Sequence, residues 1–319
     1  MKLRPAQIQF TVFAMLLFCL SACKDFIEPN ISKRTVTLNA PSDKYQSTNY
    51  NINFWWGEVE DALSYRLQVV TPGFDTIGAL VADTLIKGNR FTLTLDPGEY
   101  QWRVRAENGS SQTEFSTPNH LTVIPSSLTA QTVILGSPAN NTVTNQSNVI
   151  FKWVALFSAV NYHIQADTNN FADASHLLID LTIPGQQYTY KFPKDQNYQW
   201  RVRAESATEQ SKWSVVNNIS FDATPPAGVT LSSPQNNAVI SKPVSLQWTK
   251  SATASNYKLY VYKADSTTLY STAYPALLNT NNYSFTLGSS GERIYWQVTA
   301  LDAAGNESTP SALQSFVLQ

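Results

Sequence analysis

Apolar and polar residues alternate with a period of two along much of the chain. In the segment Tyr65–Val69 the first, third and fifth residues are apolar, and Arg66 and Gln68 lie between them. Such alternation is typical of a β-strand with one face buried and the other in water. No segment beyond the first 34 residues shows a helical stripe of apolar residues. The pattern therefore predicts an all-β protein built from antiparallel sandwiches.

The strand pattern occurs three times. Four landmarks recur at intervals of 95 to 98 residues: a proline, a tryptophan, a tyrosine nine residues later and a second tryptophan. The four sets are Pro41, Pro138 and Pro234; Trp56, Trp153 and Trp248; Tyr65, Tyr162 and Tyr257; and Trp102, Trp200 and Trp296. A fixed register over four landmarks indicates an internal repeat. We predict domain 1 at residues 35–125, domain 2 at 131–223 and domain 3 at 227–319.

The segment around the second tryptophan resembles a known family. Leu95-Asp96-Pro97-Gly98-Glu99-Tyr100, followed by Trp102 and Val104, resembles the E–F corner and F strand of fibronectin type III domains. The resemblance implies three tandem immunoglobulin-like sandwiches over nearly all of the chain after residue 34. It also implies that the Tyr100 and Tyr198 hydroxyls bond back to the main chain as a tyrosine corner. Domain 3 departs from this pattern, because Ile294 stands in the corner position.

The N-terminus has the pattern of an export signal. Lys2 and Arg4 precede an apolar run from Phe10 to Leu20, which is short for a membrane span. The following Leu20-Ser21-Ala22-Cys23 resembles the bacterial lipobox, so we predict a lipoprotein signal peptide at 1–22, lipidation at Cys23 and a tether at 23–34. The resemblance implies a membrane partner through the lipid, and the residue after Cys23, which is not Asp, favours the outer membrane, with the protein exposed on the cell surface. The alternative is an ordinary secretory signal with a chance cysteine.

The charge and cysteine content argue against two classes of function, nucleic-acid binding and catalysis by a cysteine nucleophile. The net charge is −1 and charged residues make up 14% of the chain, so no basic field is present to attract nucleic acid. Both cysteines, Cys19 and Cys23, lie in the signal segment. The folded part therefore has neither a disulfide nor a thiol nucleophile, and its stability depends on its apolar cores.

The sequence shows no catalytic constellation. His120, His163 and His176 are scattered, and no phosphate-binding loop or nucleophile motif is present. Asp167, Asn169 and Asp173 offer oxygen ligands for calcium, but they lack the ligand number and glycine spacing of a calcium loop. We predict no enzymatic activity, no metal and no cofactor.

Arginines and aromatic residues occur together on outward positions of domains 1 and 2. Nine residues after the end of the strand that contains each arginine pair lies an aromatic residue. The two sets are Arg103 and Arg105 with Phe115, and Arg201 and Arg203 with Trp213; domain 3 has Gln297, Thr299 and Thr309 in these places. Ser211-Lys212-Trp213-Ser214 resembles part of the tryptophan–serine box of cytokine receptors, in which arginines stack on tryptophan. We predict a structural guanidinium–ring stack in domains 1 and 2.

Tyrosines take the outward positions in domain 3. Tyr260 and Tyr262 alternate with apolar residues in one predicted strand, and Tyr295 lies outward in its predicted neighbour. Exposed aromatic rings suit sugar rings or a protein partner, so we predict these three as ligand-binding residues. Tyr270 and Tyr274 are expected to extend this face. The alternative is ordinary cross-strand pairing that stabilises the sheet. Trp55, at an outward position in domain 1, is a weaker candidate.

These features together predict a non-catalytic cell-surface lipoprotein for binding or adhesion. Domains 1 and 2 act as a stalk in this interpretation, and domain 3 presents the binding tip to a glycan or protein ligand. The alternative is an accessory subunit of an outer-membrane polysaccharide-capture or secretion complex.

Overall fold

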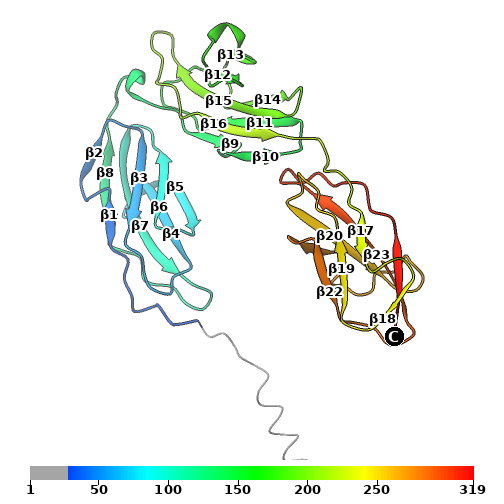
Figure 1. Cartoon of the computed structure of the whole chain (residues 1–319). Helices are drawn as coiled ribbons and strands as arrows, with labels where there is room; N and C mark the ends of the chain where they lie inside the picture. Colours follow the sequence, from blue (N-terminus) through cyan, green and yellow to red (C-terminus); the bar gives the residue numbers. More distant parts are fainter. Residues whose placement is uncertain (1–27) are drawn as a thin grey trace, which may run out of the picture. The chain divides into compact units, whose positions relative to one another are not determined.

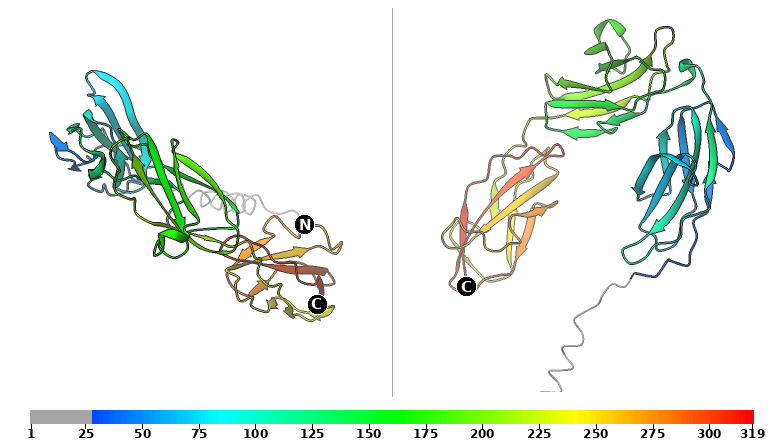
Figure 2. Two further views of the ribbon diagram at one scale, coloured as in Figure 1. Left: turned by 90° about the horizontal axis from the view of Figure 1, so that it is seen from above. Right: turned by 180° about the vertical axis from the view of Figure 1, so that it is seen from behind.

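The computed structural model describes residues 28–319, and it is built from β-strands with two short 3₁₀ turns. Cys23 and the signal segment 1–22 lie outside the described residues, so export and lipidation stay predictions. Within 28–319, no helix has the length and apolar character needed to cross a bilayer. The chain divides into two compact units, one ending at Ser126 and the other spanning Ser127–Gln319. The strands form tandem sandwiches (Figure 1 and Figure 2). Each sandwich has a three-stranded and a five-stranded sheet.

The first sandwich, repeat 1, carries strands β1 to β8. Its three-stranded sheet has the order β1 (Leu38–Ala40), β3 (Asn51–Trp56), β6 (Arg90–Thr94). Its five-stranded sheet has the order β2 (Tyr45–Ser47), β8 (Asn119–Val123), β7 (Gly98–Glu107), β4 (Ser64–Pro72), β5 (Ile77–Ile86). The two inner faces meet where the ring centroids of Phe54 and Trp102 lie 5.0 Å apart.

Repeat 2 carries strands β9 to β16 and both 3₁₀ turns, η1 (Leu128–Ala130) and η2 (Ala174–His176). One sheet has the order β14 (Gln187–Lys191), β11 (Asn148–Trp153), β9 (Leu135–Ser137). The other has the order β10 (Thr142–Thr144), β16 (Asn217–Phe221), β15 (Gln196–Glu205), β12 (Asn161–Asp167), β13 (Ile179–Ile183). Phe151 and Trp200 make the equivalent core contact at 4.8 Å.

Repeat 3 carries strands β17 to β24. One sheet has the order β17 (Leu231–Ser233), β19 (Val244–Trp248), β22 (Asn282–Phe285). The other has the order β18 (Ala238–Ile240), β24 (Gln314–Leu318), β23 (Arg293–Leu301), β20 (Asn256–Tyr262), β21 (Ala276–Leu278). The all-β, tandem-sandwich fold expected from the alternation is therefore confirmed. That each sandwich folds as a separate domain within the predicted boundaries stays a prediction.

The register of the two central strands explains the alternation. Leu67 pairs with Val104, Ile164 with Val202 and Leu259 with Val298, and all six side chains are fully buried. Because side chains on a strand alternate between faces, the residues on either side of these pairs point away from the core. We call this polar side of each five-stranded sheet its outer face.

The tyrosine corner is present where the sequence predicts it. The Tyr100 hydroxyl donates to the Asp96 carbonyl at 2.8 Å, and the Tyr198 hydroxyl donates to the Lys194 carbonyl at 2.7 Å. Each bond holds the turn that leads into a central strand of the five-stranded sheet, β7 in repeat 1 and β15 in repeat 2. In repeat 3 the Ile294 side chain is fully buried instead and offers no hydroxyl for such a bond.

The segment Glu28–Arg34, which we expected within the tether 23–34, packs against repeat 1. Ile31 is fully buried, and its main-chain N–H donates to the Ser111 hydroxyl at 3.0 Å. Arg34 forms an ion pair with Asp61 at 2.9 Å. The Glu28 carboxylate accepts a hydrogen bond from the main chain of Gly109. From Glu28 onward, the residues before β1 are thus part of the packed structure.

Candidate functional site

The outer faces of the three repeats are made by the same pair of central strands but carry different chemistry. In repeats 1 and 2 these strands present arginines, and in repeat 3 they present tyrosines. The strands position the side chains rigidly because both are hydrogen-bonded in the middle of a sheet. What covers each face is decided by the loops that follow β4, β12 and β20, and by the segment before the last strand.

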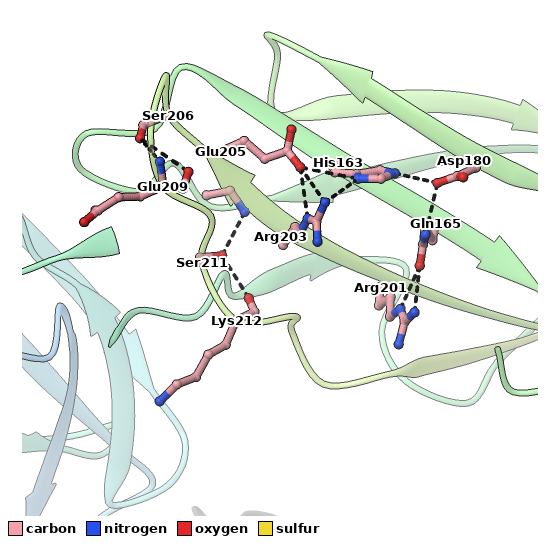
Figure 3. Close-up of polar contacts among 11 residues, drawn as sticks. His163, Gln165, Asp180, Arg201, Arg203, Glu205, Ser206, Glu209, Ser211 and Lys212 are labelled. Carbon is pink, nitrogen blue, oxygen red and sulfur yellow. Dashed lines mark hydrogen bonds and ion pairs between the residues drawn. The ribbon is translucent and has the colours of Figure 1, made fainter. Parts of the chain in front are cut away.

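In repeat 2 the Arg201 guanidinium lies between two aromatic rings. Its central carbon is 4.1 Å from the centroid of Phe171 and 4.4 Å from that of Trp213. Two of its nitrogens donate to the Gln165 side-chain oxygen at 3.0 and 2.7 Å, as Figure 3 shows. Burial and the neighbouring Arg203 charge lower the pKa of Arg201. The guanidinium therefore loses part of its hydration in the stack. Its contacts with the two rings and its hydrogen bonds to Gln165 compensate for that loss.

The same outer face carries a network of charged groups around His163. One ring nitrogen of His163 lies 2.5 Å from the Asp180 carboxylate, and the other lies 3.2 Å from Arg203. Arg203 also donates to Glu205 at 2.9 Å (Figure 3). His163 therefore lies on the outer face and is held there by these neighbours.

Repeat 1 repeats this arrangement with different rings. The central carbon of Arg103 is 4.1 Å from the centroid of Phe74 and 4.3 Å from that of Phe115. Arg103 donates twice to the Gln68 side-chain oxygen, at 3.0 and 2.8 Å. The predicted stack is thus confirmed in both repeats.

Each stack has a second aromatic side that was not predicted from the sequence. Phe74 and Phe171 cover the arginines from the loop after the first central strand, and neither was predicted to do so. A signal was present, because each phenylalanine lies nine residues after the strand tyrosine, Tyr65 or Tyr162. The corresponding residue in repeat 3 is Ser266, which has no ring.

Hydroxyl side chains place the second ring. The Ser211 and Ser214 hydroxyls accept hydrogen bonds from the main-chain N–H groups of Ala204 and Val202, at 2.9 and 3.0 Å. These bonds satisfy N–H groups of β15 beyond the part of the strand that pairs with β16, and they turn Trp213 over the arginines. Figure 3 shows Ser211 in this position.

Repeat 3 uses the same hydroxyl bonds one residue later. The Ser308 and Ser311 hydroxyls accept from Ala300 and Val298, at 2.9 and 3.1 Å. The residue between them that corresponds to Trp213 is therefore Pro310, and the sequence prediction of Thr309 for this place is wrong. An extra residue in the preceding loop shifts the alignment. The outer face of repeat 3 lacks both covering rings.

The three predicted tyrosines lie together on this uncovered face. The Tyr260 and Tyr262 rings are nearly parallel, at 13°, with centroids 6.3 Å apart. Tyr295 lies directly opposite Tyr262 in the register of β20 and β23. All three are partly exposed. The structure thus brings the three candidate residues together on one surface.

A carboxylate organises the polar groups beside the tyrosines. Glu307 accepts hydrogen bonds from Lys258 at 2.6 Å, Thr299 at 2.6 Å and the Tyr260 hydroxyl at 3.3 Å. Burial raises the pKa of Glu307, but the bonds from Lys258 and Thr299 outweigh it and leave the pKa below its usual range. Burial and the Glu307 charge raise the pKa of Tyr260. The Tyr262 hydroxyl accepts from Gln297 at 2.9 Å, so both phenols are held in place.

Tyr270 and Tyr274 do not extend this face, so that expectation is wrong. Tyr274 is buried in the core of repeat 3, and its hydroxyl lies 3.3 Å from that of Tyr283. Tyr270 packs against the same core, with its ring edge-on to Phe285 at 5.5 Å. The loop after β20 folds inward over the open side of the sandwich, which the local sequence does not reveal.

The acidic loop of repeat 2 has a structural explanation. The Asp167 carboxylate is buried and accepts from the Phe171 N–H at 2.6 Å, which holds the ring over Arg201. Asp173 caps the turn η2 by accepting from the Ser175 N–H at 2.9 Å. Across residues 28–319, no three His, Cys, Asp or Glu side chains gather as a metal site.

Comparisons with known proteins add structural neighbours. No family model matches the chain, and no curated protein matches its sequence. The chicken CNTN1 FN1–FN3 domains align with 16% identity and a TM-score of 0.41, covering 89% of this chain and 97% of theirs. Fibronectin(III)-like modules of Clostridium thermocellum CbhA align with 13% identity and a TM-score of 0.39, covering 59% and 94%. Both similarities are weak, so the fold rests on the strand order and contacts given above.

Proposed function

We propose that the protein is a non-catalytic lipoprotein of the outer membrane, exposed on the cell surface, that binds a glycan or protein ligand for adhesion. The ligand contacts the tyrosine face, which we define as Tyr260, Tyr262 and Tyr295. The observation that carries this proposal is the near-parallel pair of rings on the one outer face that lacks covering aromatic residues. The lipobox-like Leu20–Cys23 supports the membrane anchor.

The internal comparison explains why this face is the best candidate. Repeats 1 and 2 enclose their outer-face arginines between rings from two loops, so those aromatic surfaces are already used. Repeat 3 keeps the same strands and the same hydroxyl bonds but has Ser266 and Pro310 where the rings would be. Its tyrosines are therefore available to an external partner, and the hydrogen-bonded hydroxyls of Tyr260 and Tyr262 reduce the entropy lost on binding. Repeats 1 and 2 act as the stalk.

A double substitution in the full chain tests the proposal. The Tyr260→Ala, Tyr295→Ala double variant should no longer bind intact cells. It should also no longer bind any array glycan to which the wild-type protein binds. Loss of stacking rings from a binding site costs about 2 kcal/mol or more, whereas exposed cross-strand pairs contribute about 0.2–1 kcal/mol to stability. Affinity should therefore fall much more than the melting temperature. Tyr260→Phe with Tyr295→Phe is the matched control and should keep binding.

The readouts distinguish the ligand classes. An array signal without a crosslinked partner identifies a glycan, whereas a crosslinked protein that disappears in the alanine variant identifies a protein ligand. A membrane protein that co-purifies stably would instead identify an accessory subunit of a larger complex. If the alanine variant binds like the wild type, the tyrosines only cover the sheet and the proposal is wrong.

A further inference from the structure

Repeat 1 exposes two aromatic side chains on a surface separate from the outer faces described above. Trp55 lies on β3 and is 41% exposed, and Tyr45 lies on β2 and is 43% exposed. The residues on either side of Trp55 in β3, Phe54 and Trp56, are buried in the core. The Trp55 ring therefore points to the solvent side of the three-stranded sheet. Tryptophan side chains in folded proteins are usually mostly buried. An indole with this much exposed surface therefore indicates a candidate ligand-binding surface.

Two adjoining hollows connect these aromatic residues. One, of about 380 Å³, is lined by Tyr45 together with several asparagines of β1 and β3 and the turns beside them. The other, of about 490 Å³, is lined by Trp55 and Arg90. Ala40 and Asn53 line both. We call these two adjoining hollows together the trough; Tyr45 lines one, and Trp55 lines the other together with Phe54 and Phe91.

Two of the asparagine side chains that line the trough are held by hydrogen bonds. The Asn53 side-chain oxygen accepts from the Thr92 hydroxyl at 2.6 Å, and that of Asn51 accepts from Thr94 at 2.8 Å. Asn39 and Asn49 line the half that contains Tyr45. Carboxamides offer both donors and acceptors, which match the hydroxyl groups of a sugar. Exposed aromatic residues in both hollows, together with these carboxamides, are complementary to an extended oligosaccharide.

Arg90 gives the trough its charge. It pairs with Trp55 across β3 and β6, and its guanidinium carbon lies 5.1 Å from the indole centroid. Arg90 forms no ion pair within residues 28–319, and it is the one charged side chain among those that line either hollow. A stacked guanidinium keeps its N–H groups directed outward in its plane, in a geometry that fits a carboxylate or sulfate.

Repeats 2 and 3 have different residues at the positions that correspond to Tyr45 and Trp55. Repeat 2 has an equivalent hollow of about 310 Å³, with Thr142 and Lys152 in the places of Tyr45 and Trp55. Repeat 3 has Ala238 and Gln247 there. The hollow therefore belongs to the sandwich, whereas the aromatic residues and the arginine belong to repeat 1.

From these observations we infer a second binding site in the trough between Tyr45 and Trp55, for an oligosaccharide that bears acidic groups. The indole stacks on a sugar ring, Arg90 pairs with its carboxylate or sulfate, and the asparagines bond its hydroxyls. The site is independent of the tyrosine face in repeat 3.

Tryptophan fluorescence of the full chain tests this inference. The probes are oligosaccharides that carry uronate, sulfate or sialic acid groups, each paired with a neutral oligosaccharide of the same length. We expect an acidic member to change the fluorescence and to protect Trp55 from iodide quenching, with an affinity that falls as salt rises. Trp55→Ala should weaken binding at least tenfold. Arg90→Gln should remove the preference for the acidic member.

Two further variants complete the test. Lys152→Ala changes the matched position in repeat 2 and should leave the affinity unchanged. The Tyr260→Ala, Tyr295→Ala double variant should also bind the acidic oligosaccharide normally, so this site and the proposed function can fail separately. The inference is overturned if no acidic member binds, if neutral partners bind equally well, or if Trp55→Ala keeps the wild-type affinity.

Discussion

The guanidinium carbon of Arg201 lies 4.4 Å from the centroid of the Trp213 ring. Arg203 lies over the same ring at 4.7 Å, so one indole covers two cations. Phe115 does the same for Arg103 and Arg105 in repeat 1, at 4.3 and 4.8 Å. Repeats 1 and 2 thus cover two outer-face arginines with one aromatic ring each, although the rings differ. Repeat 3 lacks this arrangement.

The stack should contribute measurably to the stability of repeat 2. Trp213→Ala removes two cation–π contacts and should cost about 1–3 kcal/mol in urea unfolding. Trp213→Phe should recover much of this loss, because Phe115 fills the same role in repeat 1. Lys212→Ala, at an exposed neighbour, is the control and should change little. A Trp213→Ala protein as stable as the wild type would show that the stack does not contribute to the stability of repeat 2.

Deleting a core tryptophan tests whether the sandwiches unfold separately. Trp153 is buried, and its ring lies 5.8 Å from that of Tyr162. Trp153→Ala should cost about 3–5 kcal/mol, the usual range for a large buried aromatic residue. Calorimetry should show one transition moved to lower temperature and the others unchanged, since each sandwich has its own core. One cooperative transition shifted as a whole would contradict three separate domains.

Acid should weaken repeat 3 through Glu307. The pKa of Glu307 in the folded state lies below its ordinary value of 4.5, because hydrogen bonds from Lys258 and Thr299 outweigh its burial. The ionised carboxylate therefore adds stability that is complete above that ordinary value and is lost as the pH falls towards the lower folded value. Glu307→Gln should flatten the acid side of a stability–pH profile measured by urea unfolding from about pH 6 to about pH 3. Parallel profiles for variant and wild type would exclude this role.

Replacing the predicted lipidated cysteine tests the anchor. Cys23→Ala should leave the protein unprocessed or release it from membranes, because acyl chains are its proposed attachment. Membrane fractionation after a high-salt wash, followed by mass determination of the N-terminus, measures the effect. Ser21→Ala, which keeps a small residue two positions before the cysteine, should preserve lipidation. Retention of the Cys23→Ala protein in the outer membrane would show that the lipobox interpretation is wrong.

Features that depend on local pattern could be predicted from the order of residues alone. A period of two along each strand decides which side chains share a face, so Tyr260, Tyr262 and Tyr295 could be grouped before the structure was known. The repeated landmarks predicted the tandem sandwiches in the same way. The tyrosine corners were predictable from the resemblance to fibronectin type III domains, and in the structure each hydroxyl reaches a carbonyl only four residues away.

The groups that lie over each face depend on contacts between segments that are distant in the sequence. Phe74 and Phe171 reach the arginines because loops fold back over the sheet, and Tyr274 turns into the core for the same reason. Tyr45 and Trp55 line one trough although they lie in strands of different sheets. A strand's periodicity fixes the side on which a residue lies, but loop length and packing between distant strands fix its neighbours, and no local pattern encodes them.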